Sequence, residues 1–273
     1  MKPLVPVLIL LAACSEKAPM PEANTTAPDV SNASASSTPS KSDAPPAAKA
    51  FSAEEDTDLY GFKYDWPAEA AAIPQLVARF TKDMEKAKAE LISGATEDRE
   101  ERGRRGYDYH PHETQVSYET AGQSDRLLSL ESSVYGFTGG AHGSSGSGSL
   151  LWDRKLAREL TVSDLLQPGT SWTGAIRQPF CTLLNREREK RRGEPIQPDD
   201  LFGDCPKYHD VTVLLSDEDS NGRFDHIHVI ADQYVAGPYA EGPYEILLPI
   251  TAAMIERLKP EYRPSFQRRP PVR

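Results

Sequence analysis

The chain has 273 residues, and its 41 acidic residues outnumber its 31 lysines and arginines, which gives a formal net charge of −10. This excess of negative charge excludes nucleic acid and anionic lipid head groups as partners of the folded surface, because both would be repelled. Two basic runs, at residues 99–105 and 186–192, carry interleaved glutamates and are predicted to be solvated helix faces.

The first 14 residues have the pattern of a lipoprotein signal. Lys2 precedes an apolar run over residues 4–11, and two alanines stand directly before Cys14. Residues 1–13 are therefore predicted to be a signal peptide that is removed, and the Cys14 thiol is predicted to carry a diacylglycerol. The apolar run is too short to span a bilayer, which needs roughly 20 apolar residues. The predicted location is the cell envelope and, because no Asp follows Cys14, the periplasmic side of the outer membrane if the host is Gram-negative.

Alanine, proline, serine and threonine dominate the chain from Ser15 to about Glu55. Such a stretch buries too little apolar surface to offset the entropy of ordering it, so residues 14–55 are predicted to be a lipid-anchored, disordered linker. About 40 flexible residues have a root-mean-square reach of roughly 35 Å, enough to separate a folded domain from the bilayer. The folded domain is predicted over residues 56–262, with a tail at 263–273.

The domain mixes helices with antiparallel strands. Helical periodicity begins at Trp66-Pro67 and continues to about Arg102, with a break at Pro74. The later segments are predicted as strands at 114–118, 127–137, 150–152, 211–215, 224–230 and 244–248, and as helices at 164–166, 175–191 and 251–258. No strand–helix–strand rhythm recurs, so the predicted class is α+β, with antiparallel sheets and packed helices. The predicted halves are a helix–hairpin unit at about 56–125 and a second unit at about 126–262.

Cys181 and Cys205 are the two cysteines besides Cys14. In an oxidising compartment an isolated pair is most simply a disulfide, so these two are predicted to be bonded. The bond would close a loop of about 25 residues and stabilise the fold by roughly 3 kcal/mol in the chain-entropy model. A catalytic thiol is the alternative, but no Cys-x-x-Cys motif accompanies either residue.

Three segments together resemble one family of extracytoplasmic domains. Residues 133–142 (SVYGFTGGAH) resemble its strand and Thr-Gly-Gly-Ala-His turn, residues 151–166 its following strand and short helix, and residues 234–249 its closing loop and strand. This domain of unknown function occurs in RsiV-type anti-sigma factors, which sense lysozyme, and N-terminal to PdaC-type peptidoglycan deacetylases. The resemblance covers about Glu113 to Leu258, with the preceding helix as the expected N-terminal half.

The chain departs from the family pattern in several places. Gly143 stands where proline is common, Ala157 stands where the turn usually has glycine, and a Ser/Gly tract at 143–149 is predicted to lengthen the loop after His142. The sequence shows neither a cytoplasmic sigma-binding segment nor the His-x-x-x-His spacing of the deacetylase module. The resemblance therefore implies an envelope module that binds a protein or cell-wall material, and it supplies no catalytic residues.

Two loops contain the candidate binding residues. Gly139 and Gly140 free the backbone before His142 to approach a ligand, and His142 is a possible base or ligand; alternatively, the glycines only make a tight turn and His142 bonds a carbonyl. The second loop carries tyrosines among glycines and prolines, which could form an aromatic lip or pack as an ordinary loop. These tyrosines are Tyr234, Tyr239 and Tyr244.

Metal ligands are predicted only weakly. The run from Asp217 through Asp219 and Asn221 to Asp225 imitates a calcium loop, but His228 occupies position 12, where calcium loops have glutamate. Asn221-Gly222 between apolar runs is also a strong hairpin signal, and an acidic hairpin turn is the favoured reading. His226 lies on the same strand face as His228, the spacing of sheet zinc sites, yet no third ligand is evident. No cofactor is predicted.

The sequence thus favours a lipid-anchored envelope protein with a non-catalytic binding domain, whose partner is a lysozyme-like protein or peptidoglycan. Two alternatives remain open. One is an enzyme that acts on the cell wall as a hydrolase or deacetylase through His142 and neighbouring acids, and the other is a purely structural lipoprotein. A deep pocket that gathers His142 with a carboxylate would indicate the enzyme, and a shallow exposed patch would indicate the binder.

Overall fold

The computed structural model describes residues 47–197 and 199–270. The predicted signal peptide, Cys14 and the linker as far as residue 46 lie outside these residues. The described residues form one compact unit. None of the helices in the described ranges combines the length and apolar character that crossing a membrane requires.

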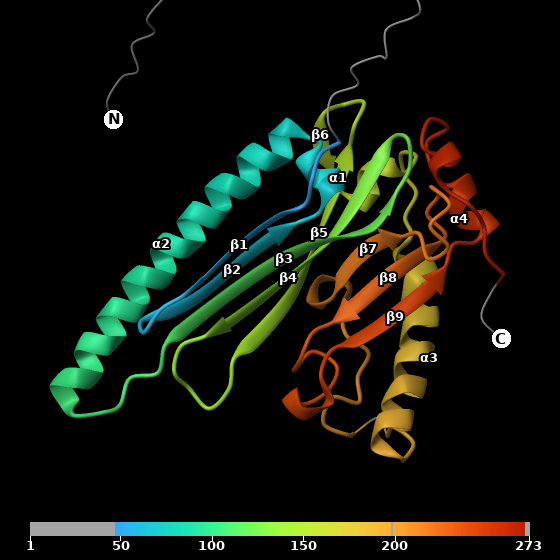
Figure 1. Cartoon of the computed structure of the whole chain (residues 1–273). Coiled ribbons are helices and arrows are strands. Elements are labelled where there is room, and N and C mark those ends of the chain that lie inside the picture. The colour runs from blue at the N-terminus through green and yellow to red at the C-terminus, as the bar shows by residue number, and fades with distance from the viewer. Residues whose placement is uncertain (1–46, 198, 271–273) are drawn as a thin grey trace, which may run out of the picture. The chain divides into compact units, whose positions relative to one another are not determined.

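A six-stranded sheet with strand order β1-β2-β3-β4-β5-β6 forms the first layer (Figure 1). Strands β2 and β3 are parallel and all other neighbours are antiparallel. The parallel pair is joined by the short helix α1 (Ala68–Ala71) and the long helix α2 (Pro74–Arg105), which runs alongside the sheet. The strands are β1 (Phe51–Asp56), β2 (Tyr60–Trp66), β3 (His112–Gln123), β4 (Leu127–Phe137), β5 (Ser144–Asp153) and β6 (Arg158–Leu160).

Alternation along the strands decides which face α2 covers. Strand β2 buries Tyr60, Phe62, Tyr64 and Trp66, every second residue, and α2 packs on them with Leu76, Phe80, Leu91 and Ala95. Pro74 begins α2, where its missing N–H has no intrahelical partner to lose. Gly106 ends the helix in the left-handed conformation, with φ of 74°.

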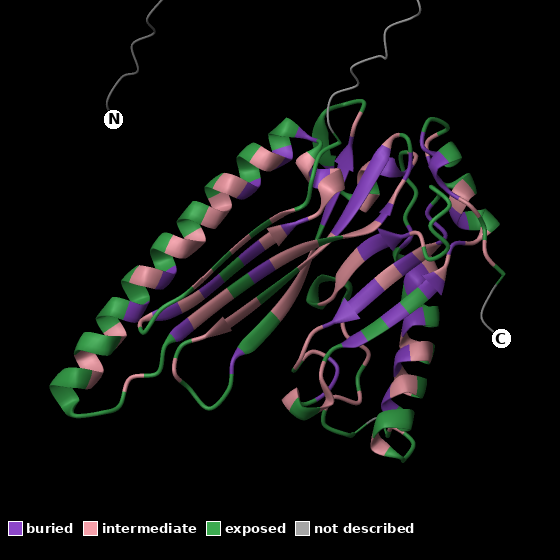
Figure 2. Ribbon diagram, in the orientation of Figure 1, coloured by how far each residue is buried: buried purple, intermediate pink, exposed green. Residues whose placement is uncertain are grey.

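The second layer is a three-stranded antiparallel sheet beside α3 (Figure 1). Its strands are β7 (Thr212–Ser216), β8 (His226–Ala231) and β9 (Tyr244–Pro249), and its helices are α3 (Thr173–Arg192) and α4 (Ala252–Glu256). The 3₁₀ turns are η1 (Val162–Leu165), η2 (Tyr208–Asp210), η3 (Tyr239–Glu241) and η4 (Arg263–Ser265). Figure 2 shows buried positions on the strands of both sheets and on the sides of α2 and α3 that face them.

Strand β4 belongs to both hydrophobic cores. Leu128 and Leu130 lie in the core beneath α2, whereas Leu127, on the opposite face of the strand, lies in the core of the second sheet. The sheets also meet where the N–H of Asp217 donates to the carbonyl of Ala121 at 3.0 Å. Gly122 allows this approach, because a Cβ there would lie 2.8 Å from the nitrogen of Asp217.

The α+β class and most predicted elements are confirmed, but the predicted N-terminal boundary is wrong. The linker was expected to extend to residue 55, whereas β1 begins at Phe51 and pairs with β2 along its length. The Phe51 ring stacks on Trp66 with 3.8 Å between ring centroids. An isolated strand of six residues has too little pattern to show in the sequence, and β2 supplies the pairing that orders it.

Two further boundaries are corrected. The division at residues 125 and 126 falls inside the β3–β4 hairpin, so the domain has no break there. The tail predicted from residue 263 is packed as far as the structure describes it, since Phe266 is buried in the second core and Arg269 pairs with Asp225.

The Ser/Gly tract at 143–149 is a strand and not a longer loop. Residues 144–149 belong to β5, which pairs with β4 from Gly136 opposite Ser144 to Leu127 opposite Asp153. Hydrogen bonds to β4 satisfy the backbone N–H and C=O groups of this segment, so it forms a strand although it has no apolar side chains. Because Gly148 has no side chain, it leaves room for Ser132. The connection between β4 and β5 is therefore only residues 138–143.

The disulfide between Cys181 and Cys205 is confirmed, with 5.5 Å between the Cα atoms. It connects the middle of α3 to the loop that precedes η2.

Reduction of this bond, or the Cys181→Ser/Cys205→Ser double substitution, should lower the melting temperature, because the denatured chain regains the entropy of a closed loop worth roughly 3 kcal/mol. Differential scanning fluorimetry with and without a thiol reductant measures the shift. The reductant should leave the double variant unchanged, and equal melting of oxidised and reduced wild type would contradict a stabilising role.

Candidate functional site

Three aromatic rings from the two sheets meet at one surface, which we term the aromatic platform. His142 lies in the β4–β5 turn, and Tyr234 and Tyr239 lie in the loop between β8 and β9. The His142 ring stacks on Tyr239 with 4.0 Å between centroids and 25° between planes, and the Tyr234 ring centroid lies 6.0 Å from that of Tyr239. The structure thus brings together residues that lie about 90 positions apart in the chain.

His142 and Tyr234 are the exposed members of the platform, Tyr239 is half-buried, and the backbone at Tyr234 is unusual. Tyr234 is 56% exposed and has a φ of 68°, a left-handed conformation that is uncommon for a bulky residue. Its N–H donates to the carbonyl of Gly237 at 2.9 Å, which closes a tight turn. Strained backbone of this kind persists only where the surroundings fix it, and it is concentrated at functional sites.

The hydrogen bonds of His142 determine its tautomer. Nδ1 lies 2.8 Å from the carbonyl oxygen of Gly143, which can only accept, so Nδ1 carries the proton. In the neutral ring Nε2 is then an acceptor, and the hydroxyl of Tyr234 lies 3.5 Å from it. His142 therefore makes both the carbonyl bond expected of a turn histidine and the aromatic contacts of the platform.

The β4–β5 turn is fixed from outside by the end of α2. Gly139 adopts a φ of 78°, and its carbonyl faces Nη2 of Arg102 at 3.4 Å. A Cβ at Gly139 would approach that guanidinium to 3.0 Å, so the turn requires glycine for both its φ and its packing. Gly140 has no such close neighbour and is exposed.

His142 lacks the partner that a general base needs. None of the ion pairs within residues 47–197 and 199–270 includes His142, and its ring contacts are a carbonyl, a phenol and a stacked tyrosine. A catalytic histidine is ordinarily oriented by a carboxylate or paired with a nucleophile. The geometry favours a binding surface over a catalytic site.

Tyr244 is not part of the exposed surface. Its side chain is fully buried in the second core, and its hydroxyl donates to Glu241. Burial and this contact raise the pKa of Tyr244. The guanidinium of Arg191 lies over its ring, 4.0 Å from the centroid. The aromatic lip predicted from three tyrosines thus consists of Tyr234 and Tyr239, with Tyr244 beneath the loop.

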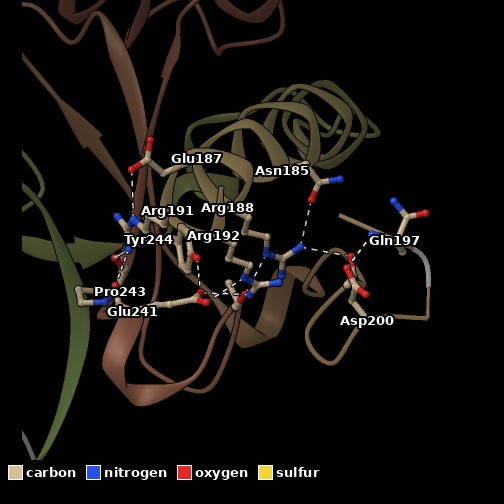
Figure 3. A network of polar contacts seen from close by, with 12 residues as sticks. Asn185, Glu187, Arg188, Arg191, Arg192, Gln197, Asp200, Glu241, Pro243 and Tyr244 are labelled. Atoms are coloured by element: carbon tan, nitrogen blue, oxygen red, sulfur yellow. Dashed lines mark hydrogen bonds and ion pairs between the residues drawn. The ribbon is translucent and has the colours of Figure 1, made fainter. Parts of the chain in front are cut away.

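The C-terminal arginines of α3 fix the β8–β9 loop, and Figure 3 shows this network. Arg191 donates to the carbonyls of Glu241 and Pro243, both at 2.8 Å. Arg192 pairs with the Glu241 carboxylate at 2.8 and 3.1 Å, and this contact, more than any other, holds the pKa of Glu241 below its ordinary value. Arg188 is fully buried and donates to the carbonyl of Ala236 at 2.8 Å.

The prediction that residues 186–192 form a solvated helix face is therefore wrong for part of the run. The sequence did contain a signal for Arg188, because it continues the buried stripe of α3 at a spacing of four residues. That stripe is Ile176, Phe180, Leu184 and Arg188.

The face of the first sheet opposite α2 is acidic over β1–β4. Residues paired across strands share a face, and the register places one lysine there, Lys63, which lies 3.4 Å from Asp65. We term this surface the acidic face. Its carboxylates are Glu54, Asp56, Asp65, Glu113, Glu119 and Glu131. It borders the platform where Glu113 pairs with Phe137, just before the β4–β5 turn.

The predicted calcium loop is a hairpin connection between β7 and β8. The carboxylates of Asp217, Asp219 and Asp225 come within 4.8 Å of one another. Asp217 accepts the N–H groups of Asn221 and Gly222, at 3.2 and 2.8 Å, and Arg269 pairs with both Asp219 and Asp225. Backbone N–H groups and one side-chain cation already occupy carboxylate oxygens of all three aspartates, which favours the hairpin reading.

The strand histidines pair with carboxylates instead of converging on a common point. Nδ1 of His226 lies 2.8 Å from Asp225, and His228 lies between Glu131 and Glu245 at 3.5 and 3.6 Å. Within the described residues, the three aspartates of the hairpin are the one group whose ligand atoms are close enough to share a metal ion.

Asp225 is a buried carboxylate whose charge is stabilised locally. Burial alone would raise its pKa, but the N–H of Glu218, the ring of His226 and the guanidinium of Arg269 together hold the pKa of Asp225 below its ordinary value. A carboxyl group with a depressed pKa stabilises the fold above its unfolded pKa of about 4, and this contribution is lost as the pH falls.

Arg269→Met should therefore lower the melting temperature at pH 7, because a fully buried carboxylate loses its cation. The difference from wild type should shrink as the pH falls from 5 to 3, where protonation of Asp225 removes the advantage of the pair. Thermal melts between pH 7 and pH 3 measure both the loss of melting temperature and its dependence on pH. Arg268→Met, at the exposed neighbouring position, is the matched control, and a difference that stays constant down to pH 3 would show that the ion pair is not its cause.

Comparison with known proteins gives one family match and a set of similar folds. Residues 53–145 match the family model described as Deacetylase PdaC. A DUF3298 family member from Bacteroides fragilis is similar in structure, with 18% identity, a TM-score of 0.49, and coverage of 80% of this chain and 95% of that one. A DUF3298 family protein from Pseudomonas aeruginosa PAO1 has 20% identity, a TM-score of 0.48, and coverage of 82% and 96%. No curated protein matches the sequence.

The family match supports the PdaC part of the predicted resemblance. It includes β1 from Ala53 onward, β2–β4, α2 and the β4–β5 turn, and therefore the acidic face and His142. Tyr234 and Tyr239 lie outside the matched residues.

Proposed function

We propose that this chain is a lipid-anchored protein of the cell envelope whose folded domain binds a basic, lysozyme-like protein without catalysing a reaction. The observation that carries the proposal is the aromatic platform, where two loops from different sheets bring the exposed rings of His142 and Tyr234 against the half-buried ring of Tyr239, beside an acidic face. Tyrosine supplies large contact area at low entropic cost and is enriched among the residues that dominate protein interfaces.

Charge supports a basic partner. The acidic face has six carboxylates and a single lysine in β1–β4, and the whole chain carries a net charge of −10. Complementary charge accelerates encounter and rejects partners of the same sign. Binding should accordingly be fast and should weaken as salt is added.

Peptidoglycan is the second candidate, because stacked aromatic rings also suit the apolar faces of sugars. Its glycan strands bring no positive charge to match the acidic face, which is why a basic protein ranks first. An enzyme that uses His142 ranks lower, since no carboxylate orients its ring in the part of the chain described here.

Tyr239→Ala should weaken binding to hen-type lysozyme about 10- to 30-fold, the loss expected for a central aromatic contact worth roughly 1.5–2 kcal/mol. Biolayer interferometry of the mature protein in detergent, at 50 and 300 mM salt, measures both the affinity and its salt dependence. Leu156→Ala is the control, since Leu156 is an exposed apolar residue in the β5–β6 turn. Binding that is insensitive to Tyr239→Ala would remove the platform from the interface.

The same protein incubated with purified peptidoglycan separates the other candidates. Sedimentation with the insoluble polymer but no affinity for lysozyme would favour the glycan. Release of acetate or muropeptides that His142→Ala abolishes would replace the binder with the enzyme.

The anchor yields a separate prediction. Cys14→Ser should abolish lipidation and leave an unprocessed precursor, because only the thiol accepts the diacylglycerol. Mass spectrometry of the membrane fraction detects the lipid on wild type. A wild-type chain without lipid would remove the envelope anchor from the proposal.

A further inference from the structure

The structure assigns Arg188 as the buried positioning residue of the aromatic platform, beside the exposed-side contacts of Arg191 and Arg192, with the Cys181–Cys205 disulfide fixing the contacts that keep Arg188 in place. The expected effect of Arg188 on partner binding rests on the proposed function. Its expected effect on the order of the β8–β9 loop does not.

Arg188 is a buried cation without a carboxylate partner among the residues described. Its side chain is fully buried, and burial, with the nearby charge of Arg192, lowers its pKa. A buried charge is tolerated only where hydrogen bonds replace the lost water. Here the acceptors are neutral oxygens from three different segments of the chain.

The guanidinium donates to three segments of the chain, and Figure 3 shows Arg188 beside Asn185 of its own helix. Nε donates to the carbonyl of Ala236 at 2.8 Å, Nη1 to Asn185 at 3.1 Å and to the carbonyl of Gly203 at 3.3 Å, and Nη2 to the carbonyl of Asp204 at 3.1 Å. Because a planar guanidinium has a fixed fork of donors, a shift of any one segment disturbs the bonds to the others.

The Ala236 contact lies in the loop that bears the platform. Ala236 is fully buried and stands between Tyr234 and Tyr239 in the sequence. Gly237 beside it allows close packing, since a Cβ there would come within 2.9 Å of the Tyr244 ring. The bond from Arg188 therefore fixes the centre of the loop to α3, and the two platform tyrosines extend from either side of that point.

The other contacts are fixed by the disulfide. Cys205 directly follows Asp204, and it is bonded to Cys181, which lies seven residues, or about two helical turns, before Arg188 on α3. The covalent bond thus confines the carbonyls of Gly203 and Asp204 above the Arg188 side chain. An uninterrupted series of contacts connects the disulfide to Arg188, to Ala236 and so to the platform.

Hydrogen–deuterium exchange of the mature protein tests this without a ligand. In Arg188→Lys, which keeps the charge but not the fork, amides of residues 232–243 should exchange about tenfold faster while β3 and β4 keep wild-type protection. Cys181→Ser/Cys205→Ser should accelerate exchange both in 199–205 and in 232–243. Arg186→Lys, at an exposed position of the same helix, is the matched control and should change neither.

The combined variant tests whether coupling passes through Arg188. With Arg188→Lys already present, loss of the disulfide should add little in 232–243 and should still accelerate 199–205. Unchanged exchange at 232–243 in either single variant, or equal acceleration in every segment, would overturn the assignment. If the loop loosens as expected but lysozyme never binds, the proposed function fails and the role of Arg188 stands.

Discussion

The position of β4 between two hydrophobic cores is the constraint on which the rest of the structure depends. Its alternate residues pack under α2 and against the second sheet, and the neighbouring strand β5 does the same with Leu150 and Leu151, so the two sheets are fixed to each other through both faces of these strands. The strand ends in the turn that carries His142, and the β8–β9 loop extends from the sheet on its other face. Because both loops begin at strands of the same packed framework, their aromatic rings are held next to each other.

Buried polar groups fix the loops where apolar packing cannot. Arg188 satisfies its donors with backbone carbonyls and the Asn185 side chain, and Asp225 satisfies its charge with Arg269, the His226 ring and the N–H of Glu218. Such groups are costly unless every partner is in place, which makes them specific for one arrangement of the chain. The platform thus has a fixed shape although it consists of loop residues, and a preformed surface binds with a smaller entropic loss.

The contacts of His142 suit a binding surface better than a catalytic site. His142 donates through Nδ1 to its own turn and stacks on Tyr239, so its ring is committed to structure on two sides. A general base needs an orienting partner and access to a substrate proton, whereas a binding surface needs exposed rings with fixed orientation. Tyr234 is exposed and Tyr239 is half-buried, so the geometry of the platform fits the second requirement better than the first.

The sequence by itself determined the elements whose signals are local. Pro74 marks the break at which α2 begins, helical periodicity predicts that helix to about Arg102, alternation predicts β4, and two cysteines in an oxidising context predict their own bond. His142, Tyr234 and Tyr239 were also identifiable as candidates, because glycines and aromatic residues stand out in loops.

Only the tertiary structure decided which residues meet and which are buried. The Ser/Gly tract is a strand because β4 supplies its hydrogen bonds, and no property of serine or glycine indicates that neighbour. Arg188 is buried and Tyr244 lies beneath the platform because segments distant in the chain cover them. The local sequence pattern reflects the preference of each residue for a conformation, whereas burial and contacts depend on the whole packed chain. The platform exists because of those long-range contacts.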